Sequence, residues 1–338
     1  MTTAALPEPS FRACVGRLLD AEPGTLRFAP LSGGVSSDIW RVDHGNLTFC
    51  AKRALPRLKV SARWEVSTRR NAEEVRWLRA AREWVGEEAA EVIAADEAQG
   101  IAILTWYDPG HWRNWKAELL ADRVDPAVAA RLGMLLGSIA RESARRPELA
   151  SEFANADLFD ALRVDPFFRY LVSAHPALEP LIHQLENDHA TLVHGDFSPK
   201  NVLVDEHCRV RILDAECATW GSPGFDPGYL LAHLLLKRVC TDNPVLTTAA
   251  LRFWTAYVDT VDGAFARLDQ RTYLPLAGML LARVDGKSPV EYLTETQRCW
   301  IRDQALTLLE RPPVPIVHLL ESWPSGPAGA PQREQTGT

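Results

Sequence analysis

The sequence lacks the features that mark membrane, secreted, disulfide-bonded and nucleic-acid-binding proteins. Its longest apolar runs, 229–236 and 274–282, are far shorter than the roughly 20 residues of a membrane-spanning helix. Six cysteines lie far apart without a CxxC pair, which argues against a disulfide framework or a zinc site. A net charge of −7 argues against a nucleic-acid partner. The first ten residues lack the basic start and apolar stretch of a signal peptide, so we expect a cytoplasmic protein without membrane contact.

The negative charge is unevenly distributed along the chain. Residues 1–105 carry as many basic as acidic side chains, so the whole excess of −7 falls in residues 106–338. An acidic second part would attract a cationic small substrate. An acidic surface that keeps the protein in solution explains the same charge equally well. The composition is otherwise that of a globular protein, with 46% hydrophobic and 24% charged residues.

The order of sequence patterns predicts an α+β fold with two lobes. Strands and Gly-containing turns are expected in 26–55, a helix in 69–86 and a buried strand in 100–107. The strand breaks at 108–110, so we predict an N-lobe of 1–107, with residues 1–10 flexible, and a C-lobe of 108–312. A Pro- and Gly-rich tail, 313–338, is expected to end in disorder. The C-lobe is predicted to be mostly helical, with helices at 126–144, 156–172, 176–189, 226–238, 245–262, 270–283 and 294–310.

One β-rich stretch of the second part, TLVHGDFSPKNVLVDEHCRVRILDAE (191–216), places polar residues at the ends of short strands. Asn201 follows Asp196 by five residues, and Asp214 comes after a short hairpin. Protein kinases use an Asp and an Asn at this spacing, and a later Asp, to hold the attacking hydroxyl and Mg²⁺. Hard oxygen ligands suit Mg²⁺ beside a phosphoryl group. The stretch therefore predicts a phosphoryl-transfer centre.

The motif HGDFSPKNVLV…ILDAE resembles the aminoglycoside phosphotransferase and choline kinase-like family, over most of the chain. The resemblance implies a bilobal protein kinase-like fold, with Asp196 as the catalytic base or hydroxyl-orienting carboxylate. It makes Asn201 and Asp214 the Mg²⁺ ligands. Glu216 would support the metal shell, and His194 would fix the loop backbone.

Two further residues near this motif have two interpretations each. Lys200 would neutralise the transferred phosphoryl group, or it is a solvated loop lysine. Asp226 resembles the family's Asp that supports the catalytic loop from the next helix, and it also suits a helix N-cap.

The first part of the chain would supply the nucleotide site. LSGGVSSDIWRV resembles the family's GGxSN turn, in which Gly33 and Gly34 let backbone N–H groups approach phosphate oxygens. Ser36 and Ser37 would add hydroxyl groups, with Ser37 standing where relatives have Asn.

A lysine and a helix glutamate are expected to complete the phosphate site. Lys52 lies on the strand face opposite Phe49 and Ala51, and corresponds to the kinase lysine that contacts the α- and β-phosphates. Its partner would be Glu74, which fits the family's E-x-x-x-L best, with Glu73 as the alternative.

Thr105 to Tyr107 resemble the hinge that binds adenine through its backbone. Because such a hinge needs no particular side chain, the sequence leaves the choice of ATP or GTP open.

The acceptor is expected to be a small alcohol. Gly195 replaces the Arg of protein kinases, and few residues separate Asp214 from the next helix, which leaves little room to bind a peptide. Trp112 belongs to an aromatic group that forms either an ammonium cage or ordinary packing. We expect an aminoglycoside-like antibiotic or an amino or sugar metabolite such as a choline-like alcohol, and a monomer or homodimer. The alternative is a catalytically silent binding protein. The candidate substrate residues are Ser198, Trp112, Arg283 and Asp285.

Overall fold

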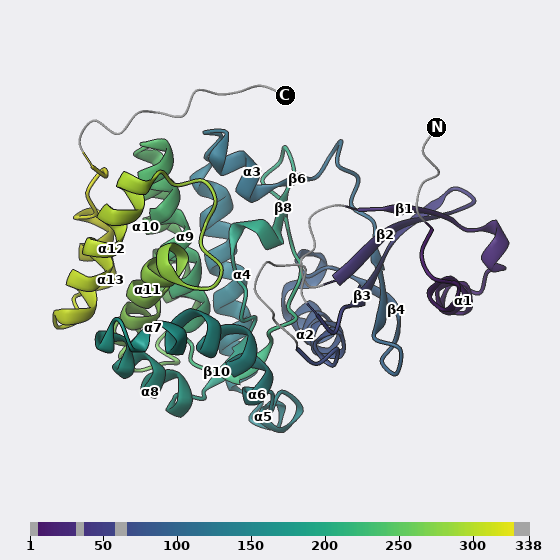
Figure 1. The fold of residues 1–338 in the computed structure, drawn as a ribbon, viewed down its shortest axis with the longest axis horizontal. Helices are drawn as coiled ribbons and strands as arrows, with labels where there is room; N and C mark the ends of the chain where they lie inside the picture. The colour runs from purple at the N-terminus through teal and green to yellow at the C-terminus, as the bar shows by residue number, and fades with distance from the viewer. Residues whose placement is uncertain (1–5, 32–36, 58–65, 328–338) are drawn as a thin grey trace.

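The computed structural model describes residues 6–31, 37–57 and 66–327, and its elements fall into a sheet-rich and a helical part (Figure 1). We use N-lobe for the elements from α1 to β5 and C-lobe for those from β6 to α13. The N-lobe elements are α1 (Pro9–Leu18), the 3-10 helix Pro23–Thr25, β1 (Arg27–Pro30), β2 (Ser37–His44), β3 (Leu47–Ala54), α2 (Arg70–Val85), the 3-10 helix Gly86–Glu88, β4 (Val92–Asp96) and β5 (Ile101–Thr105).

The C-lobe is built mainly from helices. Its elements are β6 (Arg113–Asn114), α3 (Trp115–Leu120), α4 (Pro126–Ala144), α5 (Leu149–Glu152), α6 (Ala156–Phe159), the π-helix Asp160–Arg169, α7 (Tyr170–Val172), the 3-10 helix Pro176–Leu178, α8 (Glu179–Asn187), β7 (Thr191–Val193), the 3-10 helix Pro199–Asn201, β8 (Val202–Val204), β9 (Val210–Ile212), β10 (Thr219–Gly221), α9 (Phe225–Thr241), α10 (Val245–Val261), α11 (Leu268–Asp285), α12 (Glu295–Glu310) and α13 (Ile316–Glu321).

The N-lobe sheet is antiparallel, in the order β1-β2-β3-β5-β4. Alternate residues of its strands face opposite sides, as the pleat requires. Ala51 and Ile103 pack with Phe11 of α1 on one side. On the other side, Ala102 joins the core that contains Trp77 of α2. The alternation turns Lys52, the neighbour of Ala51, toward the side that faces the C-lobe.

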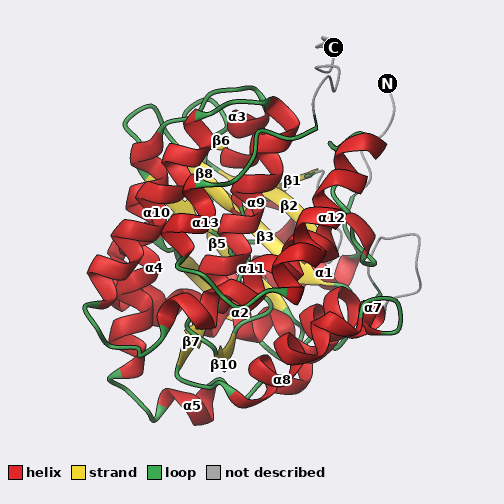
Figure 2. Ribbon diagram, turned by 90° about the vertical axis from the view of Figure 1, so that its left-hand side faces the viewer, coloured by secondary structure: helices red, strands yellow, loops and turns green. Residues whose placement is uncertain are grey.

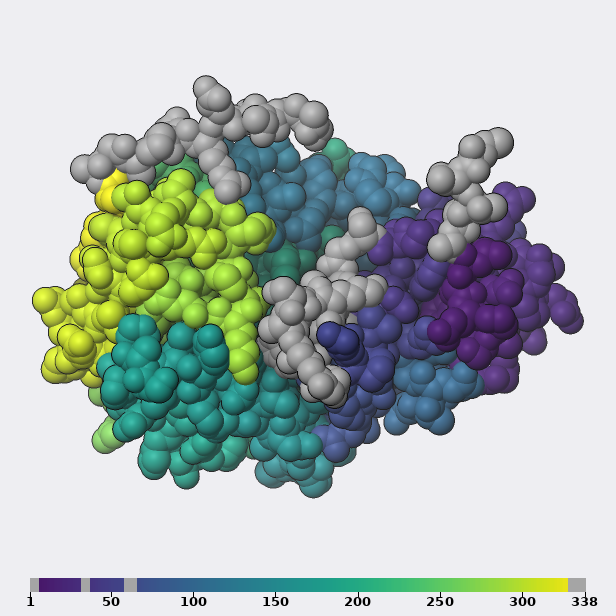
Figure 3. Space-filling model, in the orientation of Figure 1, coloured from purple at the N-terminus to yellow at the C-terminus, as the bar shows by residue number. Residues whose placement is uncertain are grey.

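Two small antiparallel sheets of the C-lobe carry the motif that the sequence analysis selected. β7 pairs with β10, and β8 lies between β6 and β9. Helix α9 is buried over nearly its whole length and packs against α10 and α11. Figure 2 shows the helices of the C-lobe in front of the strands, and Figure 3 shows the two lobes side by side.

The predicted fold class, a small β-rich lobe with one long helix and a larger helical lobe, is confirmed. Each of the seven helices predicted for the C-lobe is found as helical structure, although 156–172 is divided by π-helical turns around Pro166. Helices α1, α3, α5 and α13 were not predicted, and α1 begins inside the terminus expected to be flexible. The lobe border at 107/108 stays a prediction. No helix among the described residues is both long and apolar enough to span a membrane.

Helices α4 and α10 pack closely because two glycines of α4 leave room for the backbone of α10. A Cβ on Gly133 would lie 2.2 Å from the carbonyl oxygen of Phe253 and 3.0 Å from the backbone nitrogen of Tyr257. A Cβ on Gly137 would lie 2.7 Å from the Cβ of Thr260. A side chain at either position would force the helices apart.

We expect Gly133→Ala to lower the free energy of unfolding by roughly 1–3 kcal/mol through overpacking. The measurement is urea denaturation followed by circular dichroism. Gly24→Ala is the matched control, because no described atom outside Gly24 and its two chain neighbours lies within 4 Å of the added Cβ. Equal stability of the Gly133→Ala and Gly24→Ala variants would contradict the packing explanation.

Candidate active site

The loop after β7 has a backbone conformation that suits glycine. Gly195 has a φ of 77°, in the left-handed region. A Cβ on Gly195 would lie 2.3 Å from the carbonyl oxygen of Cys217. Protein kinases have an Arg at the position of Gly195. A side chain at this position here would push away the segment between β9 and β10 that contains Cys217.

Asp226, at the start of α9, holds this loop through its backbone. Its buried carboxylate accepts hydrogen bonds from the N–H groups of His194 (2.7 Å) and Gly195 (2.9 Å). Burial raises the pKa of Asp226 to about 7, although the two N–H groups act in the opposite direction. The structure thus places Asp226 against the loop, and its side chain makes no N-cap hydrogen bond to α9.

His194 is buried and joins the loop to the strand that leads to Asp214. Its Nδ1 accepts the N–H of Asp196 (3.1 Å), and its Nε2 lies 3.0 Å from the carbonyl oxygen of Leu213. Burial lowers the pKa of His194 to about 4, so the ring is neutral at pH 7, as one accepting and one donating nitrogen require. His194 therefore connects two segments, and its ring packs against Trp77 in a T-shaped arrangement.

Asp196 is buried between two cations. Its Oδ2 lies 3.0 Å from Nη2 of Arg163 and 2.9 Å from Nζ of Lys200. Its Oδ1 is buried and has no hydrogen-bond partner among the described residues. Burial alone would raise the pKa of Asp196, but Arg163 and Lys200 outweigh burial and hold it well below its usual value. Asp196 is therefore ionised at neutral pH and keeps one oxygen unengaged.

Arg163 was not selected in the sequence analysis. It lies in the π-helix Asp160–Arg169, and its Nε donates to the carbonyl oxygen of Gly195 (2.5 Å). It thus brings to the loop the guanidinium that Gly195 cannot supply. No spacing rule links it to the motif, so its position became visible only in the fold.

Lys52 joins the two lobes. Its Nζ lies 2.7 Å from Oε2 of Glu74 on α2 and forms a second ion pair with Asp214 of the C-lobe. Glu73 instead pairs with Arg76 and accepts a hydrogen bond from Asn155, so the choice between the two glutamates falls on Glu74.

The pKa values in this group follow from burial and the ion pairs. Burial would lower the pKa of Lys52, but Asp214 and Glu74 raise it well above its usual value. Burial raises the pKa of Glu74. The pKa of Asp214 is lowered, because Lys52 and Lys200 together outweigh the effect of burial.

Glu216 has a buried partner that the sequence did not indicate. Its Oε2 lies 3.1 Å from Nε of Arg70, which is fully buried at the start of α2. Arg70 also donates to the carbonyl oxygens of Leu55, Val66 and Ser67. The pair is a second ion pair between the lobes, and it connects α2 to the segment between β9 and β10.

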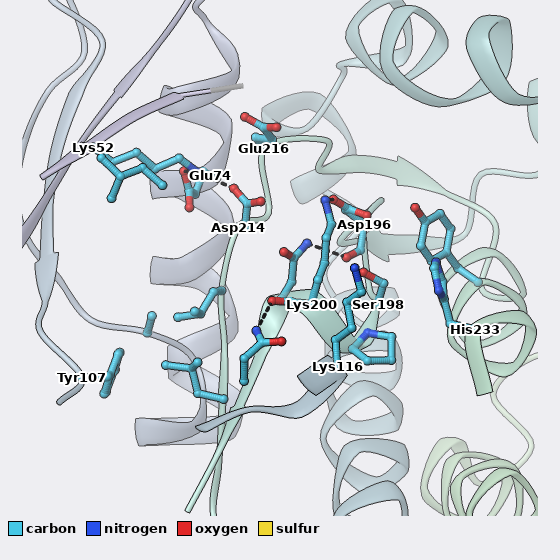
Figure 4. Close-up of a pocket in the computed structure, with 18 of the residues that line it drawn as sticks. Lys52, Glu74, Tyr107, Lys116, Asp196, Ser198, Lys200, Asp214, Glu216 and His233 are labelled. Atoms are coloured by element: carbon cyan, nitrogen blue, oxygen red, sulfur yellow. Dashed lines mark hydrogen bonds and ion pairs between the residues drawn. The ribbon is translucent and has the colours of Figure 1, made fainter. Parts of the chain in front are cut away.

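A cavity of about 610 Å³ lies between the lobes and brings most of the predicted residues together (Figure 4). Gly33, Gly34 and Ser36 lie outside the described residues. Ser37 is buried, its hydroxyl has no hydrogen-bond partner among the described residues, and it does not line the cavity. The predicted residues that line it are Lys52, Glu74, Thr105, Tyr107, Asp196, Ser198, Lys200, Asn201, Asp214, Glu216 and Arg283.

The structure places two candidate substrate residues away from this cavity. Trp112 packs edge-on against Tyr107, and the guanidinium of Arg211 lies 4.4 Å from the centre of its ring. Asp285 forms two hydrogen bonds of 2.6 Å with Arg302. Both side chains are thus occupied in packing and ion pairing. Lining residues that the sequence analysis missed include Asn114, Lys116, Arg163, Tyr229, His233, Lys237 and Tyr292.

Asn201 and Asp214 line the same cavity, as a shared metal site requires. The amide nitrogen of Asn201 donates to the carbonyl oxygen of Asp196 (2.9 Å), which orients the side chain. Among the described residues, no group of three or more His, Cys, Asp or Glu side chains could hold a metal ion. Mg²⁺ commonly binds through one or two carboxylates with water and substrate phosphates supplying the rest, so this donor set fits it.

The fold and the site define a phosphotransferase. Residues 27–269 match the model of the phosphotransferase enzyme family (APH), and the chain belongs to this family. It is a small-molecule phosphotransferase with an alcohol group as acceptor, as the motif predicted.

Curated relatives and solved structures resemble the chain more distantly. It is 24% identical over 277 residues, 70% of either chain, to methylthioribose kinases of Bacillus cereus (strain AH820) and Bacillus thuringiensis (strain Al Hakam). An aminoglycoside phosphotransferase from Alicyclobacillus acidocaldarius superposes with a TM-score of 0.48 and 14% identity, covering 91% of this chain and 96% of that one. A choline kinase from Cryptosporidium parvum Iowa II superposes with a TM-score of 0.46 and 10% identity, covering 89% of this chain and 93% of that one.

We expect Arg163→Met to lower the free energy of unfolding by about 3 kcal/mol, because the buried Asp196 carboxylate loses a partner. The double variant with Asp196→Asn should lose less than the sum of the two single changes, by roughly 1 kcal/mol or more. Urea denaturation of the four proteins measures this coupling. Arg145→Met, at a side chain that is 65% exposed, is the control. Strict additivity would contradict the ion pair.

Proposed function

We propose that the enzyme transfers the γ-phosphoryl group of ATP, with Mg²⁺, to a hydroxyl group of a small molecule. The observation that carries this proposal is the cavity between the lobes, where the Lys52–Glu74–Asp214 ion pairs lie beside a buried, ionised Asp196. A cation for phosphates, hard ligands for Mg²⁺ and a carboxylate for the acceptor hydroxyl are the parts that phosphoryl transfer requires.

The N-lobe residues would bind the nucleotide. Lys52 contacts the α- and β-phosphates, and Glu74 holds it in place. The backbone of Thr105 to Tyr107 binds the adenine, in a part of the cavity also lined by Leu31, Ile39 and Leu104. The turn with Gly33, Gly34, Ser36 and Ser37 completes the phosphate site in this proposal. GTP is the alternative donor.

Asn201 and Asp214 would hold Mg²⁺, which supplies charge stabilisation to the phosphate oxygens. The ion pair of Asp214 with Lys52 keeps this carboxylate ionised and directed into the cavity. Glu216, anchored by Arg70, supports the segment that carries Asp214.

Asp196 would orient the acceptor hydroxyl through its unengaged Oδ1. The acceptor oxygen bonds to the γ-phosphorus as the bond to the leaving ADP oxygen breaks, and the hydroxyl proton passes to Asp196. A carboxylate with a lowered pKa is a weak base, so orientation is its main contribution, which suits a loose transition state. Lys200, 2.9 Å from Asp196, would neutralise charge on the transferred group.

The identity of the acceptor belongs to this proposal only as a class. Relatives named methylthioribose kinase favour a sugar-like alcohol, whereas the sequence motif favours an aminoglycoside-like one with a role in resistance. The catalytically silent alternative is disfavoured, because Lys52, Asp196, Asn201 and Asp214 are all present around one cavity.

Asp196→Asn should lower kcat by about 10³-fold while the KM for ATP changes by no more than about twofold, because the residue acts on the acceptor. Coupled ADP and GDP release with Mg²⁺, across aminoglycosides, amino alcohols and sugars, measures both. Asp303→Asn, the same change at an exposed position of α12, is the control. Full activity of the Asp196→Asn variant would contradict the assignment, and so would the absence of any nucleotide binding.

A further inference from the structure

Three cations from three parts of the chain line the C-lobe end of the cavity. They are Lys116 of α3, Lys237 of α9 and Arg283 of α11, and we name them the cation cluster. Tyr292 lies among them, with Nζ of Lys237 5.1 Å and Nζ of Lys116 5.8 Å from the centre of its ring. Figure 4 shows Lys116 and His233 on the same side of the cavity as Asp196 and Ser198.

Lys237 is a fully buried amine without a carboxylate partner among the described residues. Its exposed fraction is 0%, and its Nζ contacts are long, at 3.4 Å to the carbonyl oxygen of His233 and 3.5 Å to the hydroxyl of Tyr292. Burial, followed by the charges of Lys116 and Arg283, lowers the pKa of Lys237 to about 7. An ammonium in such a place is costly unless an anion comes to meet it.

Arg283 also has a hydrogen-bond donor that is not used within the described part of the chain. Its Nη1 donates to the carbonyl oxygen and the hydroxyl of Ser288, but its buried Nε has no hydrogen-bond partner in the described part of the chain. The carboxylate that pairs with the cluster among the residues the structure describes is that of Glu291, whose side chain is 66% exposed and lies 2.5 Å from Nζ of Lys116. Within the described part of the chain, the three basic side chains of the cluster therefore have one largely solvated carboxylate as an ion-pair partner.

The carboxylates that line the cavity are, by contrast, already paired. Glu74 and Asp214 share Lys52, and Asp196 lies between Arg163 and Lys200. Glu216 pairs with buried Arg70. Among the described residues the cavity thus offers no unpaired carboxylate to a polycationic acceptor.

Helix α9 connects the cation cluster to Asp196. Tyr229, His233 and Lys237 follow one another at intervals of four residues, so they lie along one face of the helix. The ring of Tyr229 lies 5.9 Å from the guanidinium of Arg163, which pairs with Asp196. Each helical turn advances about 5.4 Å, so Lys237 lies roughly one turn beyond His233 and two beyond Tyr229. A small molecule could therefore contact both ends of this row.

We propose that the acceptor carries an anionic group, a carboxylate or a phosphate, which binds between Lys116, Lys237 and Arg283 while its hydroxyl meets Asp196. This inference rests on the proposed function and names its substrate class. It opposes the cationic acceptor that the negative net charge favoured, because that charge lies largely outside the cavity lining. Phe167, Val290 and Tyr292 would enclose the carbon skeleton between the two ends.

The direct test is a titration of inorganic phosphate and of succinate into the full-length protein, followed by calorimetry. It is done with and without saturating MgADP, at constant ionic strength set by chloride. We expect binding in the presence of MgADP, weakened at least about 10-fold in Lys237→Met and in Arg283→Met, since each removes a charge-assisted contact. Lys237→Met should fold well, because methionine suits a buried site. Lys287→Met, at an exposed lysine paired with Asp165, is the matched control.

The second part of the test measures the turnover of different acceptors. Hydroxycarboxylates and sugar phosphates are compared with the corresponding neutral alcohols and sugars, amino alcohols and aminoglycosides. Preferred turnover of a carboxylate or a phosphate compound, with a KM raised at least about 10-fold by Lys237→Met, supports the inference and tells the two sources apart.

Two results would overturn the inference. One is equal binding of phosphate and succinate by the parent protein and Lys237→Met, or no binding at all. The other is preferred turnover of neutral or cationic acceptors that Lys237→Met leaves unchanged. In both cases ADP release would still support the kinase. Absence of MgATP binding would instead contradict the proposed function. The titration without nucleotide would still test whether the cation cluster binds an anion.

Discussion

The burial of carboxylates in one cavity is the constraint on which the rest of the site depends. An ionised carboxylate is costly to remove from water, and each one here is met by a cation from a distant part of the chain. Asp196 has Arg163 and Lys200, Asp214 has Lys52, and Glu216 has Arg70. The pairs of Asp214 with Lys52 and of Glu216 with Arg70 join residues of different lobes, so they also hold the lobes together.

The glycine and the histidine of the HGD motif are consequences of the same packing. Gly195 lets the chain pass against Cys217, and neutral His194 connects the loop that carries Asp196 to the segment of Asp214. Asp226 then accepts the two backbone N–H groups that the tight loop leaves without partners inside it. The motif is therefore a folding unit around Asp196, as well as a set of chemical groups.

The sequence predicted the parts of the site that are local in the chain. Asp196, Asn201 and Asp214 lie close together in the sequence, on either side of the β8–β9 hairpin, so their spacing carried the prediction, and strand alternation turned Lys52 toward the cavity. Arg163, Arg70 and Lys237 could not be predicted, since tertiary packing alone brings them to the site. Tertiary packing also explains why Trp112 and Asp285 do not line the cavity. Trp112 packs against Arg211, and Asp285 pairs with Arg302, and no sequence pattern links either arginine to its partner.

The most direct measurement is a crystal structure of the protein with Mn²⁺ in place of Mg²⁺ and a non-hydrolysable ATP analogue, with the metal located by anomalous scattering. Our account predicts Mn²⁺ between Asn201 and Asp214, Lys52 on the α- and β-phosphates, and Oδ1 of Asp196 facing the γ-phosphate across a space open to the acceptor. A metal bound elsewhere, or a nucleotide that leaves Lys52 paired only with Glu74 and Asp214, would contradict it.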